Sequence, residues 1–383
     1  MKDLFLLDPE VAFLNHGSFG ATPAAVMANY QAWQMRLERQ PVRFFVDELF
    51  DALAQARAAL GELVGAAAGD LVFVPNVTYA VNAVIRSLKL GPADEVLLTD
   101  HEYGACERAW EFYSRRRGFS LVRQHLPLPL PLAEEVVELL WQAVTPRTRL
   151  IYFSHITSAT AQILPAAAIC GRARAEGLLS LVDGAHTVGQ LALNMAALGA
   201  DFYMGNCHKW LCSPKGSAFL YARPDVQPQL EPLVVSWGWG DERAFSLGSD
   251  FLDYLQFGGT DDFAAYLAVP AAIRFQAEHG WPAVQAGCHA LLGRALERLA
   301  AFSGLPGVYP EPAGYCQMAI APLAPIADVE AFQGRFYERF RVEAPFPEWN
   351  GRQFVRVCIQ AYNTWDDVER LLAGLVAMGL PGA

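Results

Sequence analysis

Apolar residues in the middle of the chain occur in short runs, several of them apolar at consecutive rather than alternate positions. The runs lie at residues 71–74, 96–99, 150–153, 178–182 and 218–221, with a shorter one at 201–204. Consecutive apolar residues are typical of strands that are covered on both faces. Helical patterns separate the runs at 77–88, 105–118, 132–143 and 166–176. This alternation predicts an α/β fold with a mostly parallel sheet flanked by helices.

A different pattern follows toward the C-terminus. Long helical stretches at 270–301 and 366–378 enclose two short strand candidates at 317–321 and 354–360. We therefore expect an N-terminal arm at 1–20, a large domain at 21–265 and a smaller α+β domain at 266–383.

Composition narrows the range of partners and compartments. The chain of 383 residues has 29 basic and 40 acidic side chains, a net charge of −11, which argues against a nucleic-acid partner. No uncharged stretch reaches the ~18 residues that a membrane span needs. Its seven cysteines contain no CxxC pair, which favours reduced thiols and a cytoplasmic location.

Polar side chains follow several of the predicted strands. Asp183 comes directly after 178–182, and Lys209 follows 201–204. After 71–74, the residues Asn76, Val77 and Thr78 open a helix whose free amides suit a phosphate. In parallel sheets, ligands bind at the carboxyl ends of the strands. A phosphate site, a lysine amine and a buried carboxylate at that edge are the groups that pyridoxal phosphate requires.

Only four lysines are present, at positions 2, 89, 209 and 215. Trp210 and Leu211 give Lys209 an apolar setting, which would lower the pKa of its amine as a nucleophile requires. Lys215 lies in a Ser-Pro-Lys-Gly sequence that is typical of a turn. We therefore expect Lys209 to bear the cofactor.

Motifs from one end of the chain to the other then show a resemblance to a known family. They are Phe-Leu-Asn-His-Gly-Ser-Phe-Gly at 13–20, Asp-His-Glu-Tyr-Gly-Ala at 100–105, Ser-His-Ile-Thr-Ser at 154–158, Asp-Gly-Ala-His at 183–186, Trp-Asn-Gly-Arg-Gln-Phe-Val-Arg at 349–356 and Gln-Ala-Tyr-Asn at 360–363. The chain resembles the isopenicillin N epimerase-like subfamily of the class V (fold-type I) pyridoxal-phosphate-dependent aminotransferase superfamily. The resemblance implies a fold-type I enzyme.

The resemblance also implies residue roles around the cofactor. Lys209 would bind it through a Schiff base and act as an acid–base group, while Asp183 would pair with the pyridine nitrogen and His186 would approach the phenolic oxygen. His101 or Tyr103 would lie over the ring, with His101 favoured for stacking and Tyr103 as a proton donor. Phosphate contacts would come from Asn76, Val77, Thr78, Asn206 and His208. Thr260 would reach the phosphate of a partner subunit, which implies a homodimer with shared sites.

For the substrate, the resemblance implies an amino acid. Arg356 would hold its carboxylate, because a planar guanidinium suits two oxygens. Arg352 would assist, and Asn15 and His16 would line the mouth of the site. Ser158 stands where many relatives carry an asparagine, so the chain departs from the family pattern at that position.

The family admits several reactions at the α- or β-carbon of an amino acid. We expect an epimerase or racemase; a carbon–sulfur β-lyase of the cysteine-conjugate or sulfoxide type, or an aminotransferase, remains the alternative. A desulfurase is disfavoured because residues 346–354 contain no cysteine. A zinc hydrolase using His155, His186, Cys207 and His208 lacks a metal-binding motif, so no metal is expected. A nicotinamide dehydrogenase would need GxGxxG after a strand, and none occurs.

Overall fold

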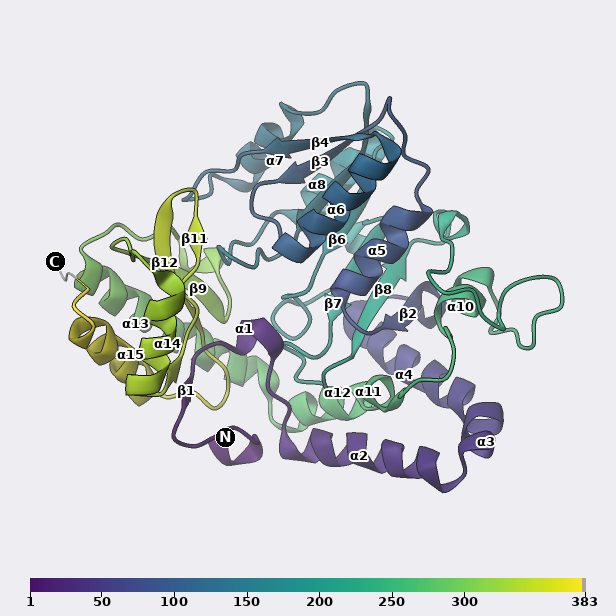
Figure 1. Ribbon diagram of the computed structural model, residues 1–383, viewed down its shortest axis with the longest axis horizontal. Helices are drawn as coiled ribbons and strands as arrows, with labels where there is room; N and C mark the ends of the chain where they lie inside the picture. Colours follow the sequence, from purple (N-terminus) through teal and green to yellow (C-terminus); the bar gives the residue numbers. More distant parts are fainter. Residues whose placement is uncertain (381–383) are drawn as a thin grey trace.

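A seven-stranded sheet forms the centre of the protein (Figure 1). The computed structural model describes residues 1–380; residues 381–383, the end of the expected C-terminal domain, lie outside the described residues. The strands are β2 (Leu71–Val74), β3 (Glu95–Thr99), β4 (Ser120–Gln124), β5 (Thr148–Ser154), β6 (Leu179–Asp183), β7 (Phe202–Asn206) and β8 (Ala218–Ala222), in the order β2-β8-β7-β6-β5-β3-β4. From β7 to β4 all pairs are parallel, whereas β8 is antiparallel to both of its neighbours. The predicted α/β fold with a mostly parallel sheet is confirmed.

Helices cover both faces of this sheet, which explains the consecutive apolar positions. One face packs against α5 (Val77–Ser87), α6 (Gly104–Arg117) and α10 (Asp250–Leu255). The other packs against α4 (Leu49–Val64), α7 (Ala133–Trp141), α8 (Ala166–Ala175), α11 (Ala264–Leu267) and α12 (Val269–Glu278). In β2, Val72 and Val74 join the first core and Leu71 and Phe73 the second. Successive side chains of a strand point to opposite faces, so each strand serves two cores.

Two of the differences from the sequence prediction concern an edge strand and a long helix. Strand β4 was not predicted because it is an edge strand: its residues are half-buried or exposed, and Arg123 pairs with Glu107 and Glu111 on α6. The helix predicted at 270–301 is two helices, α12 and α13 (Trp281–Ser303). They are separated at Gly280, whose φ of 61° is a left-handed conformation that ends a helix.

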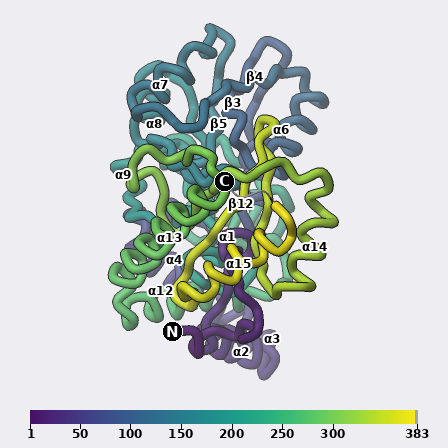
Figure 2. Tube along the Cα trace, turned by 90° about the vertical axis from the view of Figure 1, so that its left-hand side faces the viewer, coloured from purple at the N-terminus to yellow at the C-terminus, as the bar shows by residue number. Residues whose placement is uncertain are grey.

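A smaller antiparallel sheet lies beside the large one. It consists of β9 (Met318–Leu323), β11 (Glu348–Trp349) and β12 (Arg352–Cys358), in the order β11-β12-β9. Helices α13, α14 (Val329–Phe340) and α15 (Trp365–Ala377) pack with it, and the side view shows this layer in front of the large sheet (Figure 2). Helix α2 (Ala24–Arg39) and the short helices α3 (Pro41–Arg43) and α9 (Met195–Leu198) lie outside these groups. Within residues 1–380, no helix combines the length and hydrophobicity needed to cross a membrane.

The N-terminal arm connects the two sheets. Strand β1 (Ala12–Phe13) pairs in parallel with β10 (Val342–Glu343) of the C-terminal layer, and α1 (His16–Phe19) follows. At the next residue, Gly20, φ is 74° and a Cβ would lie 2.0 Å from the carbonyl oxygen of His208. Only glycine permits so close an approach in this conformation. The arm therefore packs directly on the backbone that carries Lys209.

Candidate active site

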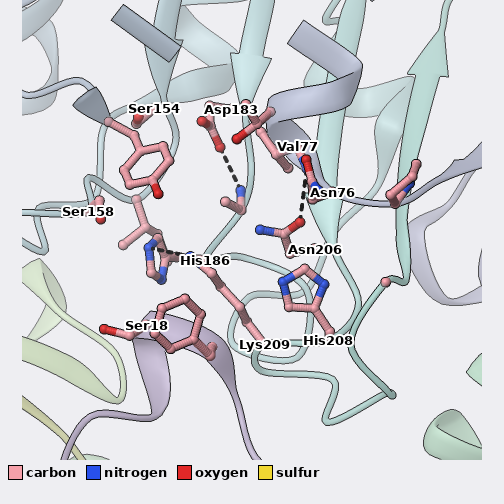
Figure 3. Close-up of a pocket in the computed structure, with 17 residues that line it drawn as sticks. Ser18, Asn76, Val77, Ser154, Ser158, Asp183, His186, Asn206, His208 and Lys209 are labelled. Atoms are coloured by element: carbon pink, nitrogen blue, oxygen red, sulfur yellow. Dashed lines mark hydrogen bonds between the residues drawn. The ribbon is translucent and has the colours of Figure 1, made fainter. Parts of the chain in front are cut away.

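A cavity of about 310 Å³ opens where β5, β6 and β7 end (Figure 3). Ser154, Asp183 and Asn206 are the last residues of these strands, and all three line it. The start of α5 and the tip of the N-terminal arm close other sides. The lining residues include Ser18, Phe19, Asn76, Val77, Thr78, Tyr103, Ile156, Ser158, His186, His208 and Lys209. The carboxyl edge of the sheet thus gathers most of the predicted site residues in one place.

Lys209 is the lysine that lines this cavity. Its side chain is 9% exposed, and Nζ lies 3.2 Å from Nε2 of His186. Burial, followed by the nearby charge of Arg356, lowers the pKa of Lys209 to about 8. Lys215 is exposed and does not line the cavity. The lowered pKa brings the neutral amine, which is the nucleophilic form, within reach near neutral pH, although the ammonium form still predominates at pH 7.

Asp183 is a buried carboxylate at the base of the cavity. Within residues 1–380, the donors to it are neutral groups: the backbone N–H of Ala185 at 2.9 Å, the hydroxyl of Tyr152 at 3.2 Å and the thiol of Cys106 at 3.7 Å. Burial raises the pKa of Asp183, although the Ala185 amide opposes this shift. A carboxylate kept from water with only neutral partners favours a cationic ligand group beside it. A protonated pyridine nitrogen meets that requirement.

The start of α5 forms the opposite end of the cavity. Asn76 caps the helix by accepting the N–H of Tyr79 at 2.8 Å. The side-chain oxygen of Asn206 accepts the N–H of Val77 at 3.1 Å, which leaves the amide NH₂ of Asn206 directed away from the helix (Figure 3). His208 donates from Nδ1 to the carbonyl of Ser217 at 3.0 Å. The NH₂ of Asn206 and Thr78 therefore place donors at a helix N-terminus, which is suited to a phosphate.

Of the two adjacent candidates for the ring face, Tyr103 lines the cavity and is 46% exposed. His101 is buried behind the cavity and does not line it. Its Nε2–H donates to the carbonyl of Leu126 at 2.8 Å, its Nδ1 accepts the hydroxyl of Thr160 at 2.7 Å, and its ring stacks on Trp349. Both ring nitrogens and one ring face of His101 are thus engaged away from the cavity, and stacking of His101 on the cofactor stays a prediction.

Arg356, on β12, lies behind the serines at the cavity wall. Its guanidinium donates to the carbonyl of Ser158 at 2.6 Å, the hydroxyl of Ser18 at 2.9 Å and the side-chain oxygen of Asn15 at 3.2 Å. Nε has no partner within residues 1–380, and the residue is 7% exposed. A buried guanidinium whose acceptors are all neutral is arranged to receive an anion.

Arg356 itself does not line the cavity, and neither do the other expected substrate residues. Arg352 lies over the ring of Phe354 and donates to the carbonyl of Leu128 at 3.4 Å. Asn15 is buried beside Arg356. His16 is fully buried: Nε2–H donates to the carbonyl of Lys209 at 2.9 Å, and Nδ1 accepts the hydroxyl of Tyr362 at 2.9 Å. Burial lowers the pKa of His16 to about 3, so this residue is neutral and joins the arm to Lys209 instead of lining the mouth.

Thr260 is exposed and lies outside the main cavity. It lines a second cavity of about 200 Å³ together with Gln256, Gly258 and Gly259.

Some residues at the site were not predicted from the sequence. Ser18 and Phe19 line the cavity, and Tyr152 and Trp210 contact Asp183 and His186. Glu102, next to Tyr103, is a buried carboxyl that accepts the hydroxyls of Thr99 at 2.5 Å and Ser154 at 2.7 Å. Burial raises the pKa of Glu102 to about 8. The motif at 13–20 pointed to Ser18 and Phe19, but nothing in the sequence distinguished them from their neighbours.

Comparison with known proteins agrees with this geometry. The model of the family "Aminotransferase class-V" matches residues 19–331. The chain belongs to the class V aminotransferase family. Class V enzymes depend on pyridoxal phosphate, and this protein is a class V pyridoxal-phosphate-dependent enzyme with the fold-type I architecture.

Similar sequences include enzymes of two kinds. The isopenicillin N epimerases of Amycolatopsis lactamdurans and Streptomyces clavuligerus are each 38% identical, with 96% and 97% of this chain and 95% and 96% of those proteins covered. A probable chloroplastic L-cysteine desulfhydrase of Arabidopsis thaliana is 30% identical, covering 97% of this chain and 84% of that protein.

Solved structures of this class V fold include a complex of the cystine C–S lyase C-DES with cysteine persulfide. Its TM-score is 0.83 at 22% identity, with 97% of this chain and 98% of that chain covered. A cysteine desulfurase of Escherichia coli has a TM-score of 0.81 at 20% identity, with 98% and 97% covered. At these identities the likeness establishes the fold.

Proposed function

We propose that this class V enzyme epimerises or racemises an amino acid at its α-carbon. The observation that carries the proposal is that the amine of Lys209 and the phenol of Tyr103 line one cavity, together with the carboxylate of Asp183 and the residues at the start of α5. Two proton-carrying groups at one site are what inversion of a carbon requires. The two isopenicillin N epimerases, at 38% identity, support the same reaction.

The residues present fit pyridoxal phosphate. Asn206, Thr78, His208 and the start of α5 would hold the phosphate, and Asp183 would hold the ring nitrogen. When bound, the cofactor withdraws electrons from the substrate α-carbon and so makes its hydrogen acidic.

The chain supplies binding and proton transfer. In the proposal, Arg356 binds the α-carboxylate through its guanidinium and orients the α-carbon. Lys209, with its pKa lowered to about 8, takes the α-proton on one side. Tyr103 returns a proton on the other side, which gives the opposite configuration. Return of the proton by Lys209 alone restores the starting configuration.

A β-elimination that breaks a carbon–sulfur bond is the second candidate. It is favoured by the similarity to cysteine desulfhydrases, of which the probable chloroplastic enzyme of Arabidopsis thaliana is 30% identical. It uses Lys209 and Arg356 in the same way but needs no proton from Tyr103. An aminotransferase also needs these residues, together with a keto-acid substrate. A desulfurase that forms a persulfide is disfavoured, because no cysteine lines the cavity within residues 1–380.

Isotope exchange separates these reactions. We would incubate the holoenzyme with candidate amino acids, sulfur-containing ones included, in deuterated water and follow configuration and products. Deuterium at the α-carbon with inversion supports the proposal. Pyruvate with sulfide or a released thiol would replace it with the lyase, and a keto acid formed with loss of the amino group would replace it with the aminotransferase.

The variant Tyr103→Phe tests the second proton donor. We expect inversion to fall at least about 100-fold, since a positioned acid–base group contributes about 10²–10⁴-fold. Exchange of the α-hydrogen with retention should continue through Lys209. Unchanged inversion would show that Tyr103 is not the donor.

We further propose a cytoplasmic homodimer in which Thr260 reaches the partner's cofactor phosphate. Thr260 is exposed on its own chain, and Val234, Val235, Trp237 and Trp239 expose 51–70% of their surface in a nearby segment. Exposed apolar side chains grouped in this way are typical of an interface. The absence of disulfides among the seven cysteines is consistent with a reducing compartment. Sedimentation should give a dimer, and Thr260→Ala should weaken cofactor binding; a monomer that retains full cofactor affinity would exclude shared sites.

A further inference from the structure

Trp210, the residue after Lys209, lies next to His186 as well. The indole Nε1–H of Trp210 donates to Nδ1 of His186 at 3.3 Å, and the other ring nitrogen, Nε2, lies 3.2 Å from Nζ of Lys209. All three side chains are buried, and Trp210 is fully so. The indole, the imidazole and the amine therefore form one hydrogen-bonded chain that ends at the lysine.

The indole determines which nitrogen of His186 carries the proton. An indole nitrogen donates a hydrogen bond and cannot accept one. Nδ1 of His186 must therefore offer its lone pair to Trp210. A neutral imidazole has one N–H, so that proton lies on Nε2.

The position of this proton in turn affects Lys209. Because Nε2–H is a donor, Nζ can complete the hydrogen bond only by offering a lone pair, and only the neutral amine has one. An ammonium group would direct its own N–H toward the N–H of His186. The hydrogen-bond chain thus favours the uncharged form of the lysine.

We propose that Trp210 is a positioning residue that holds His186 in its Nε2–H form and thereby favours the neutral amine of Lys209, the form that reacts with the aldehyde of the cofactor. The proposal rests on the proposed role of Lys209 as the residue that bears pyridoxal phosphate. It adds a function to Trp210 that its burial alone does not imply.

The electrostatic surroundings act in the same direction. Burial, followed by the charge of Lys209, lowers the pKa of His186 well below its ordinary value, so the imidazole remains neutral. The titratable groups that face Lys209 come from several elements: Asp183 on β6 and His186 after it, Arg356 and Cys358 on β12, Cys106 on α6, His16 on α1, and His208, which directly precedes Lys209. Asp183 raises the pKa of Lys209, whereas Arg356 lowers it. The indole contact reinforces the effect of Arg356.

The variant Trp210→Phe separates this function from packing. Phenylalanine keeps an aromatic ring against His16, whose ring centroid is 4.9 Å from the indole, but removes the N–H. His186 is then free to carry its proton on Nδ1 and to accept a hydrogen bond from an ammonium group at Lys209. The matched control is Trp281→Phe, because Trp281 is also buried and its indole N–H has no partner within the described residues.

The measurement is the rate at which full-length apoprotein attaches pyridoxal phosphate, followed by absorbance from pH 6 to 10.5. Attachment consumes the lone pair of the neutral amine and releases water. We expect wild type and Trp281→Phe to show a midpoint near the pKa of Lys209, about 8. For Trp210→Phe we expect the midpoint to rise by about one unit, so that the rate at pH 7 falls about tenfold while the rates above pH 10 agree.

Other outcomes decide against the proposal. An unchanged profile, or a rate lowered equally at every pH, would show that Trp210 only packs. Absence of attachment in wild type, or attachment at another lysine after borohydride reduction, would instead overturn the proposed role of Lys209.

A measurement on the wild type does not depend on how well the variant folds. Nitrogen-15 NMR of histidine-labelled apoprotein at pH 7, with the His186 signals assigned by His186→Gln, should show a protonated Nε2 and a bare Nδ1. A proton on Nδ1, or an imidazolium, would contradict the proposal.

Discussion

Replacement of Arg356 by glutamine tests the proposed site for the substrate carboxylate. The substrate affinity and the free energy of unfolding should respond differently to this change. The guanidinium is 7% exposed and donates to three neutral oxygens, those of Ser158, Ser18 and Asn15. Neutral oxygens offset little of the free-energy cost of removing the guanidinium charge from water, and a bound anion would offset more of it. The change Arg356→Gln should therefore weaken substrate binding strongly but affect folding little.

The size of the effect follows from the lost hydrogen bonds. A hydrogen bond to a charged group contributes about 1.5–3 kcal/mol, and a carboxylate can accept two from a guanidinium. Loss of about 3–4 kcal/mol raises the substrate Kd by two to three orders of magnitude, at about 1.4 kcal/mol for each factor of ten. The free energy of unfolding should change by less than about 1 kcal/mol, because the buried charge is removed together with its contacts.

The assay combines two titrations of each variant. Amino-acid binding to the holoenzyme is followed by the absorbance of the cofactor, and urea unfolding gives the stability of the apoprotein. Arg352→Gln is the control, because that side chain contacts Phe354 and the carbonyl of Leu128 and does not contact the serines at the cavity wall. The Kd of this variant should stay within about threefold of wild type. An amine that lacks the carboxylate should bind wild type and Arg356→Gln equally. Equal amino-acid affinity, or an affinity loss that only follows a loss of stability, would refute the reasoning.

Three further predictions concern the surroundings of the site. Gly20→Ala should lower the free energy of unfolding by more than about 3 kcal/mol, because a residue in this left-handed conformation costs about 1–2 kcal/mol and its Cβ meets the His208 carbonyl. The control is Gly104→Ala, where nothing lies within 4 Å of the added Cβ; urea unfolding should place it within about 1 kcal/mol of wild type, and equal stability of both variants would contradict the packing of the arm. Glu102 has a pKa of about 8 in the folded protein and of about 4.5 in the unfolded chain, so the stability of wild type should fall as the pH rises from about 4.5 to about 8. In Glu102→Gln the melting temperature should depend less on pH over this range, and the same pH dependence in both proteins would contradict the prediction. Asn206→Asp should weaken the binding of pyridoxal phosphate to the apoprotein at least tenfold, which is about 1.4 kcal/mol, because the new carboxylate repels the phosphate. Asn194→Asp, at the start of α9, is the control and should leave the affinity unchanged in equilibrium dialysis.

The sheet was predictable from sequence because both of its faces are covered. Burial on two sides requires apolar residues at successive positions, and the run at 71–74 matches β2 residue for residue. The edge strand β4 lacks this requirement, and Arg123 within it makes ion pairs at the surface. Propensity alone therefore did not reveal it.

The site was predictable only as far as the strand ends determine it. Asp183 and Asn206 end adjacent parallel strands, so the topology brings them together. His101 and Tyr103 both follow β3, and which one faces the cavity depends on where α6 begins: Tyr103 directly precedes its first residue. The position of His16 depends on how the arm packs against Lys209 and Tyr362, which are 193 and 346 residues away along the chain. Contacts at such separations are set by tertiary packing and leave no local pattern.

The most direct test of the central claim is to locate the cofactor on the chain. The purified holoenzyme is reduced with borohydride, digested and analysed by mass spectrometry. We predict one pyridoxyl modification, on Lys209, and no cofactor bound covalently in Lys209→Ala. A modification on Lys215 instead, or a protein that carries no pyridoxal phosphate after reconstitution, would contradict the account.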